Sequence, residues 1–173
     1  MKIVRMGELA VSSEADDELL TIGLGSCIGV AVVDRARSVA GLAHVMLPDA
    51  AAAPNAPEGK FADTAIPALI AASEQLGARR VRLEAVMVGG AQMFEVGVGS
   101  ALDIGARNAV AVRAALAKAR IPLRAAETGG RRGRTMRLHV GAMTVTVKEA
   151  GGREVELWSA PSGQRWNAEA VSR

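Results

Sequence analysis

The chain has 173 residues, of which 50% are hydrophobic, and its 21 Lys and Arg residues against 18 Asp and Glu residues give a net charge of +3. This length suits a single domain with its own core, and no stretch reaches the roughly 18 consecutive apolar residues that a membrane-spanning helix needs. The first residues lack the apolar block of a signal peptide and Cys27 is the only cysteine, so we expect a cytoplasmic protein with no internal disulfide and no membrane insertion.

The first half of the chain predicts three strands and a long loop. Residues 19–25 form an apolar run that ends in glycines, and residues 27–34 are largely apolar and β-branched, which is typical of a buried strand. A third apolar run covers residues 39–48 and is ended by Pro48. We expect the last two runs to form a hairpin, and the Ala- and Pro-rich residues 49–60 to form a loop.

The second half alternates predicted helices with predicted strands. Residues 63–78 carry apolar side chains at helical spacing, with Asp63 as the expected N-cap and Pro67 in the first turn. The other expected elements are a strand over 79–90, a helix over 106–120 and strands over 123–127, 134–140 and 143–149. This order indicates a mixed α/β protein of the α+β type. We expect residues 1–150 to form a single domain and residues 151–173 a polar, flexible tail.

The predicted hairpin brings the only cysteine towards one of the two histidines. If its turn is centred near Ala36, paired residues have numbers that sum to about 72, which places Cys27 opposite Val45 or, with a shift of one residue, opposite His44. The spacing therefore permits a contact between Cys27 and His44 without requiring it. A lone cysteine in an apolar run is more often a small buried hydrophobe, and a lone histidine there is more often a satisfied core residue.

Both residues nevertheless map to one end of the hairpin, where a nucleophile can be exposed. A thiol beside an imidazole can attack an acyl carbon, because the imidazole lowers the pKa of the thiol and later transfers its proton. Gly25 and Ser26 lead into Cys27, so the backbone N–H groups there are candidates for stabilising an oxyanion. Thr21 lies on the incoming strand, and its hydroxyl can orient the imidazole.

Two glycine motifs allow further hypotheses. Gly89 and Gly90 end the strand predicted over 79–90, and we assign them, with the glycine and serine before Cys27, to the backbone that binds oxyanion or substrate. They can equally be a plain strand terminus. The segment "GLGSCIG" resembles a dinucleotide-binding motif, but a strand rather than a helix follows it, so a dinucleotide site is disfavoured.

The sequence argues against a metal site and against nucleic acid as a partner. A zinc site would need Cys27, His44 and His139 together, and their spacing does not support one. One segment is rich in arginine, which either solvates a turn or attracts nucleic acid, anionic lipid or an acidic protein face: Arg131, Arg132, Arg134 and Arg137. With two Phe, two Trp and no Tyr, the chain has few side chains on which bases can stack, so RNA binding is the least favoured function.

Six segments taken together resemble one family. "TIGLGSC", "GLAHVMLP", "FADTAI", "GGAQMF", "IGARN" and "ETGGRRGR" occur in this order and at similar intervals in the CheD family of chemoreceptor glutamine deamidases. The resemblance covers residues 3–149 and implies that Cys27 is the nucleophile, His44 the base and Thr21 the supporting hydroxyl. It also implies a largely antiparallel, β-sandwich-like core flanked by two main helices, similar to the catalytic domains of glutamine-deamidating toxins.

The resemblance further implies a reaction and two kinds of partner. The reaction converts glutamine side chains on the cytoplasmic helices of chemoreceptors, the methyl-accepting chemotaxis proteins, to glutamate and releases ammonia. A chemotaxis phosphatase of the CheC type is the second expected partner. Amide hydrolysis through a cysteine thioester needs no metal and no organic cofactor, so we expect none. The alternative hypothesis is a non-catalytic binding module that regulates a chemotaxis partner.

Overall fold

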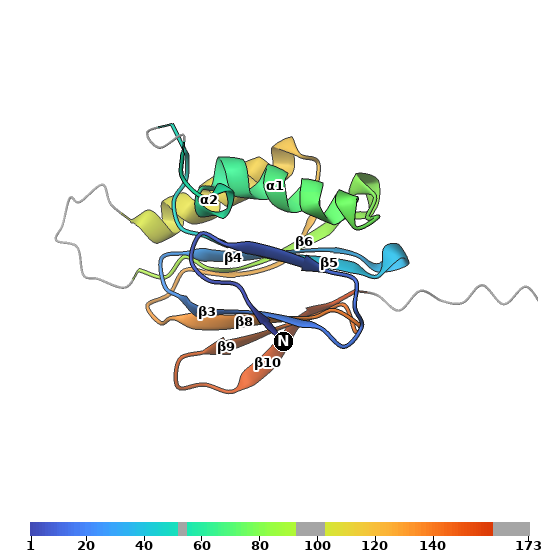
Figure 1. Ribbon diagram of the computed structural model, residues 1–173. Coiled ribbons are helices and arrows are strands. Elements are labelled where there is room, and N and C mark those ends of the chain that lie inside the picture. The colour runs from blue at the N-terminus through green and yellow to red at the C-terminus, as the bar shows by residue number, and fades with distance from the viewer. Residues whose placement is uncertain (52–54, 93–102, 161–173) are drawn as a thin grey trace, which may run out of the picture.

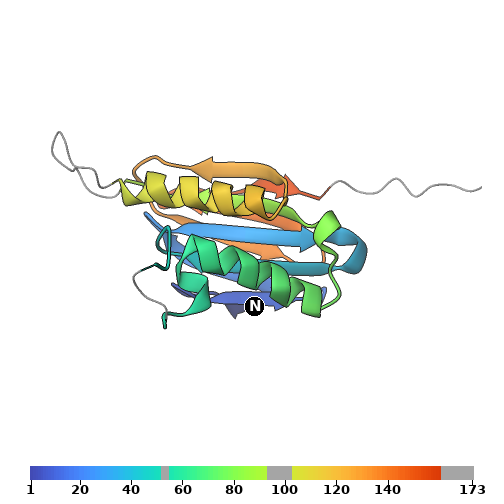
Figure 2. The same cartoon turned by 90° about the horizontal axis from the view of Figure 1, so that it is seen from above.

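Two sheets and a pair of helices make three layers. The computed structural model describes residues 1–51, 55–92 and 103–160. One five-stranded sheet, the outer sheet, has the strand order β1-β3-β8-β9-β10, and the other, the central sheet, has the order β2-β5-β4-β6-β7 (Figure 1). Both helices lie on the same face of the central sheet, and the outer sheet covers its other face (Figures 1 and 2).

The elements have the following bounds. The outer sheet consists of β1 (Lys2–Ile3), β3 (Glu18–Leu24), β8 (Arg134–His139), β9 (Thr144–Glu149) and β10 (Glu154–Ser159). The central sheet consists of β2 (Leu9–Ser12), β5 (Val39–Val45), β4 (Ile28–Asp34), β6 (Glu84–Gly89) and β7 (Leu123–Thr128). The helices are α1 (Ala62–Gln75) and α2 (Ile104–Lys118), and three short 3₁₀ turns are η1 (Arg35–Arg37), η2 (Glu58–Lys60) and η3 (Arg80–Arg82).

This architecture confirms the expected mixed α/β fold with a largely antiparallel, sandwich-like core. Only the pairs β1–β3 and β6–β7 are parallel; the other strand pairs are antiparallel. Every residue of β4 and β5 is buried, because the central sheet is covered by helices on one face and by the outer sheet on the other. Burial on both faces explains why these two strands are almost continuously apolar.

Helix α1 begins one residue earlier than expected, and its start differs in detail. Phe61 occupies the N-cap position and provides no side-chain cap. The carboxylate of Asp63, the expected cap, instead accepts hydrogen bonds of 3.1 Å from the Ala50 N–H. Because the helix starts at Ala62, Pro67 lies in its second turn rather than its first.

Strand β6 is shorter than the strand predicted over 79–90. The turn η3 takes up the first part of that range, and the strand begins only at Glu84. The turn is held by the fully buried carboxylate of Asp34, which accepts a hydrogen bond of 2.8 Å from the Arg82 guanidinium. The ion pair between Arg82 in η3 and Asp34 in β4 therefore keeps residues 80–82 in a turn, so β6 begins after them.

Both ends of the described chain add strands to the outer sheet. The two-residue strand β1 is too short to show a pattern in the sequence. Strand β10 lies inside the range predicted to be a polar tail and pairs antiparallel with β9, while residues 161–173 lie outside the described residues. None of the described helices is both long enough and apolar enough to cross a membrane.

Candidate active site

The loop that carries Cys27 links the two sheets. Strand β3 belongs to the outer sheet and β4 to the central sheet, so residues 25–27 cross from one layer to the other. Gly23, with a φ of 76°, starts the turn, and its carbonyl accepts a hydrogen bond of 2.8 Å from the Gly25 N–H. The crossing leaves Cys27 half-buried against the apolar layer between the sheets.

His44 lies in β5, beside the strand that follows Cys27. Strands β4 and β5 form the expected antiparallel hairpin, but Gly29 is the residue opposite His44. The predicted pairing of Cys27 with Val45 or His44 is therefore wrong. The turn contains four residues, 35–38, which moves its centre by half a residue and shifts every pair.

Cys27 and His44 nevertheless face the same side of the central sheet. Ile28 packs towards the helices, so its neighbours Cys27 and Gly29 face the outer sheet. His44 has the same orientation because it is directly opposite Gly29. Residues offset by two positions on paired strands lie about 7–8 Å apart diagonally, within reach of side-chain contact. Cys27 is such a diagonal neighbour of His44.

Thr21 approaches His44 from the other sheet. The Thr21 Oγ1 and His44 Nδ1 atoms lie 2.7 Å apart, which is a hydrogen bond between β3 and β5. Both side chains are buried, with exposed fractions of 0% and 1%. Among the described residues, the His44 Nε2 atom has no hydrogen-bond partner. The structure thus contains the hydrogen bond between Thr21 and the imidazole that the sequence led us to expect. The Nε2 atom has no partner in the described part of the chain and can accept a proton.

Gly29 provides the space in which this pair lies. A Cβ atom at Gly29 would lie 2.9 Å from Leu24 Cδ1, 3.0 Å from Met136 Sδ and 3.2 Å from Thr21 Cγ2. The sequence reasoning missed this residue, although a glycine inside a buried, β-branched strand is itself a sign of close packing.

The substitution Gly29→Ala is expected to reduce catalysis by roughly tenfold or more and to lower the free energy of unfolding by about 1–3 kcal/mol. The added methyl group pushes on Thr21 and so moves the hydroxyl that bonds to His44. Chemical denaturation and ammonia release measure the two effects. Gly133→Ala is the matched control, because a Cβ atom there meets nothing within 4 Å. Equal activity of wild type and Gly29→Ala would show that this space is not needed.

Gly89 and Gly90 hold the cysteine loop in place. The Gly90 N–H donates a hydrogen bond of 2.9 Å to the Cys27 carbonyl, and the Ala91 N–H donates one of 2.7 Å to the Gly25 carbonyl. A Cβ atom at Gly89, whose φ is 122°, would lie 2.2 Å from the Cys27 carbonyl oxygen. The fold therefore brings both glycines to Cys27, but the Gly90 N–H is already engaged with the loop backbone.

Unlike the Gly90 N–H, the backbone N–H groups of Ser26 and Cys27 are not engaged in hydrogen bonds with the described residues. In the described part of the chain, neither of them has a hydrogen-bond acceptor. The carbonyl of Ser26 is held by Asn108 of α2, whose Nδ2 donates to it at 2.9 Å and to the Met46 carbonyl at 2.8 Å. Asn108 is fully buried, and its Oδ1 atom has no partner among the described residues. An unpaired buried acceptor costs about 1–3 kcal/mol, so this arrangement calls for an explanation.

The sequence reasoning did not identify Asn108, although a signal was present. Asn108 lies four residues before Val112 and eight before Leu116, and these two residues are the buried apolar positions of α2. At helical spacing, Asn108 therefore had to face the core. A buried amide on a core-facing helix position indicates a specific hydrogen-bonding role.

Burial shifts the pKa values of the two reactive groups in opposite directions. It raises the pKa of the Cys27 thiol and lowers the pKa of the His44 imidazole. The net shift of the thiol pKa is therefore upward, with burial as its cause. Both shifts favour the neutral thiol and the neutral imidazole over a thiolate and an imidazolium.

The arginine-rich segment is largely compensated by carboxylates of the chain itself. Arg134 is 7% exposed and pairs with Glu127 at 2.8 Å. Arg137 pairs with Glu18 of β3 at 2.7 Å. These two arginines stabilise the packing of strands, which reduces the positive charge that the segment offers to a partner.

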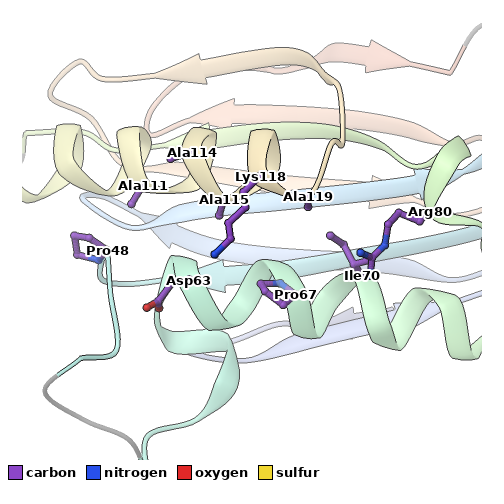
Figure 3. A pocket seen from close by; sticks show the side chains of 10 residues that line it. All are labelled: Pro48, Asp63, Pro67, Ile70, Arg80, Ala111, Ala114, Ala115, Lys118 and Ala119. Atoms are coloured by element: carbon purple, nitrogen blue, oxygen red, sulfur yellow. The ribbon is translucent and has the colours of Figure 1, made fainter.

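An apolar groove on the helical face is separate from this site. It has a volume of about 470 Å³ and lies between α1 and α2, with Pro67 and Ile70 on one side and Ala115 and Lys118 on the other (Figure 3). Cys27 and His44 face the opposite side of the central sheet. A smaller hollow of about 290 Å³, bordered by Gly90, adjoins the cysteine loop instead.

Comparison with known proteins identifies the family of this chain. Residues 46–149 match the family model of CheD, described as chemotactic sensory transduction; Cys27 and His44 precede that span. The "Probable chemoreceptor glutamine deamidase CheD" of Symbiobacterium thermophilum is 44% identical over 160 residues, 91% of this chain and 97% of that protein. The protein of the same name from Clostridium botulinum strain Hall is 44% identical over 137 residues, 78% of this chain and 85% of that protein. This chain belongs to the CheD family.

Proposed function

We propose that this protein is a cytoplasmic protein-glutamine deamidase that acts on glutamine side chains in the cytoplasmic helices of chemoreceptors. The observation that carries the proposal is the bond of 2.7 Å between Thr21 and His44, beside a half-buried Cys27 on the same face of the sheet. A nucleophile, a base and a group that orients the base are the parts that acyl transfer requires. The printed names of the similar proteins support receptor glutamines as the substrate.

The first chemical step forms a thioester. With its Nδ1 protonated, His44 donates to the Thr21 hydroxyl oxygen and keeps a lone pair on Nε2. This nitrogen takes the proton of the Cys27 thiol as the sulfur attacks the carbon of the substrate amide. The carbonyl electrons move to oxygen, and the N–H groups of Ser26 and Cys27, which have no acceptor among the described residues, are the proposed donors to that oxyanion. The protonated imidazole then gives its proton to the nitrogen, the C–N bond breaks, and ammonia leaves.

The second step releases the product. His44 takes a proton from a water molecule, which attacks the thioester carbon, and the C–S bond breaks to restore the thiol. The sum is amide plus water to carboxylic acid plus ammonia, with no net oxidation. A neutral thiol and a neutral imidazole in the resting state fit this mechanism, since the proton moves only when the substrate carbonyl is in place.

Mass spectrometry of receptor cytoplasmic fragments tests the proposal directly. Each deamidation replaces NH₂ with OH and adds about one dalton, and one ammonia is released for each event. We expect a mass gain at particular glutamines that depends on Cys27. If no glutamine of any receptor fragment gains mass while the fragments bind, the proposed activity is wrong.

The substitution Thr21→Val is expected to reduce kcat by roughly 10- to 100-fold with little change in the binding of receptor fragments. Valine keeps the shape and volume of threonine but removes the bond to His44, so the base loses its orientation. The stability change is smaller, because a net hydrogen bond contributes about 0.5–1.5 kcal/mol. Thr135→Val in β8 is the matched control, since it makes the same change on a strand of the same sheet away from His44. Wild-type turnover in Thr21→Val would mean that Thr21 only packs.

A regulatory role can coexist with catalysis. We infer that a CheC-type phosphatase is a second partner, because the resemblance to the CheD family implies one. The competing hypothesis, a binding module without catalysis, predicts that alkylation of Cys27 leaves every function intact. Loss of ammonia release with phosphatase binding retained would separate the two functions.

A further inference from the structure

Asn108 connects the two segments that carry the nucleophile and the base. Its Nδ2 group donates to the carbonyl of Ser26, the residue before Cys27, and to the carbonyl of Met46, two residues after His44. These segments are 20 residues apart in the chain, from Ser26 in the loop before β4 to Met46 directly after β5. The β4–β5 ladder pairs Ile28 with Val45, and this buried amide adds a further link between the two segments beyond the end of the ladder.

The orientation of this amide follows from its partners. Both neighbours are carbonyl oxygens, which can only accept, so the nitrogen has to face them and the oxygen has to face away. The Oδ1 atom consequently has no partner among the described residues. Within residues 1–51, 55–92 and 103–160, this arrangement places two donor hydrogens while one buried acceptor finds no partner, which indicates that holding the two carbonyls matters.

The bond to Ser26 also sets the direction of the next N–H group. No cis peptide bond is found in the described residues, so the Ser26–Cys27 peptide is trans and its carbonyl and N–H point in opposite directions. Because the Ser26 carbonyl points to Asn108, the Cys27 N–H points away from α2. This N–H has no acceptor in the described part of the chain. It is a fixed donor on the same residue as the sulfur.

Helix α2 is a firm support for this arrangement. A Cβ atom at Gly105 would lie 2.5 Å from the Gly90 carbonyl oxygen, so the first turn of the helix lies directly against the backbone that holds Cys27. Asn108 follows one turn later and is fully buried. This close packing of α2 against the Gly90 backbone supports the position of the amide relative to both carbonyls.

We propose that Asn108 is a positioning residue that holds the Ser26–Cys27 peptide so that the Cys27 N–H serves as the oxyanion donor. The proposal rests on the proposed acyl-transfer chemistry of Cys27, but not on glutamine being the substrate. Without the amide, the Ser26 carbonyl is free to turn, and the N–H turns with it. Reactions that build negative charge on a carbonyl oxygen then lose their donor, whereas reactions of the sulfur without such charge do not.

Two reactions of the same sulfur test this directly. In acylation by p-nitrophenyl acetate, the thiolate attacks the ester carbon, an oxyanion forms, and p-nitrophenolate leaves. In alkylation by iodoacetamide, the sulfur displaces iodide from a saturated carbon and no oxyanion forms. For Asn108→Ala and Asn108→Asp we expect acylation to be roughly 10- to 100-fold slower than in the wild type, and alkylation at the same pH to stay within about twofold.

Controls separate positioning from general damage. Cys27→Ala gives the background rate from other nucleophiles. Ser73→Ala removes another fully buried polar group, whose hydroxyl bonds to the Leu69 carbonyl in α1, and should change neither rate. Circular dichroism verifies the fold, and if either Asn108 variant unfolds, Asn108→Ser replaces it in the same comparison.

Two results would overturn the proposal. Acylation at the wild-type rate in folded Asn108 variants would show that the amide does not place the donor. A parallel loss of acylation and alkylation would show that Asn108 acts on the thiol itself. Failure of the deamidase proposal looks different: the wild type would leave receptor fragments unchanged, while the ratio of acylation to alkylation would still fall in the Asn108 variants.

Discussion

Replacing Cys27 with alanine will abolish the deamidation of receptor glutamines and leave the fold nearly intact. In the proposed mechanism Cys27 supplies the sulfur that forms the thioester, and the chain has no second cysteine to replace it. Its side chain is half-buried at the edge of the layer between the sheets, so its truncation should cost only about 1 kcal/mol of unfolding free energy. Ammonia release from receptor fragments, with thermal unfolding measured in parallel, checks both parts.

The control for this experiment is Val30→Ala, three residues after Cys27 and inside β4. Val30 is fully buried in the helix-facing core, so its truncation should destabilise the fold by more than Cys27→Ala does while the thiol remains. The opposite pattern would favour the hypothesis of a core cysteine: Cys27→Ala unfolded, with its remaining soluble fraction still active.

The substitution His44→Ala is expected to lower kcat by about 10²- to 10⁴-fold, the usual contribution of a positioned general base. The loss is large because the thiol pKa is raised by burial, so little thiolate exists at neutral pH without a base to take the proton. Part of the change is structural, since the buried Thr21 hydroxyl loses its partner at a cost of about 1–3 kcal/mol. Turnover should therefore be measured at a temperature where the variant is fully folded.

The second histidine of the chain is the natural control for His44. His139 lies in β8 and pairs with Glu18 at 3.2 Å, and its substitution by alanine should leave kcat unchanged. His44→Gln keeps a polar group next to Thr21 and should restore stability without restoring turnover. If His44→Ala keeps wild-type turnover, the imidazole has no part in the mechanism.

The pH dependence of the wild type gives an independent check of the same residue. Burial lowers the pKa of His44, so the neutral, proton-accepting form persists below the ordinary histidine pKa of about 6.5. The acidic fall of kcat/KM should therefore have its midpoint below pH 6.5 and should be absent from the residual activity of His44→Ala. Stability should also fall with falling pH in this range, because the unfolded chain binds the proton more readily than the folded one.

Much of the fold was predictable because the elements that lie between two covering layers have a strong local pattern. Strands β4 and β5 are buried on both faces, which requires apolar, β-branched residues and makes them visible in the sequence. Strand β1 has only two residues and two exposed positions, so no pattern marks it. The start of β6 depended on Asp34, which is 48 residues away from its partner Arg82.

Some features of the candidate site were also predictable from the sequence, and others were not. Cys27, His44 and Thr21 were accessible from the sequence, since reactive residue types stood beside glycines at the ends of predicted strands and matched the motifs of one family. The pairing of His44 with Gly29 was not accessible, because the register of a hairpin depends on the conformation of its four turn residues. The direction of the Cys27 pKa shift depended on how deeply the loop lies between the sheets.

By itself, the sequence determined which residues are candidates for the chemistry and that two buried strands and two helices belong to the core. Only the tertiary structure decided how those residues meet. The bond between Thr21 and His44 joins two different sheets, and Asn108 reaches the Ser26 carbonyl across 82 residues of chain. The pattern of apolar and polar residues along the chain reflects the periodicity of one helix or strand and which of its faces are covered. Contacts between layers depend on how the elements pack, which no single stretch of residues encodes.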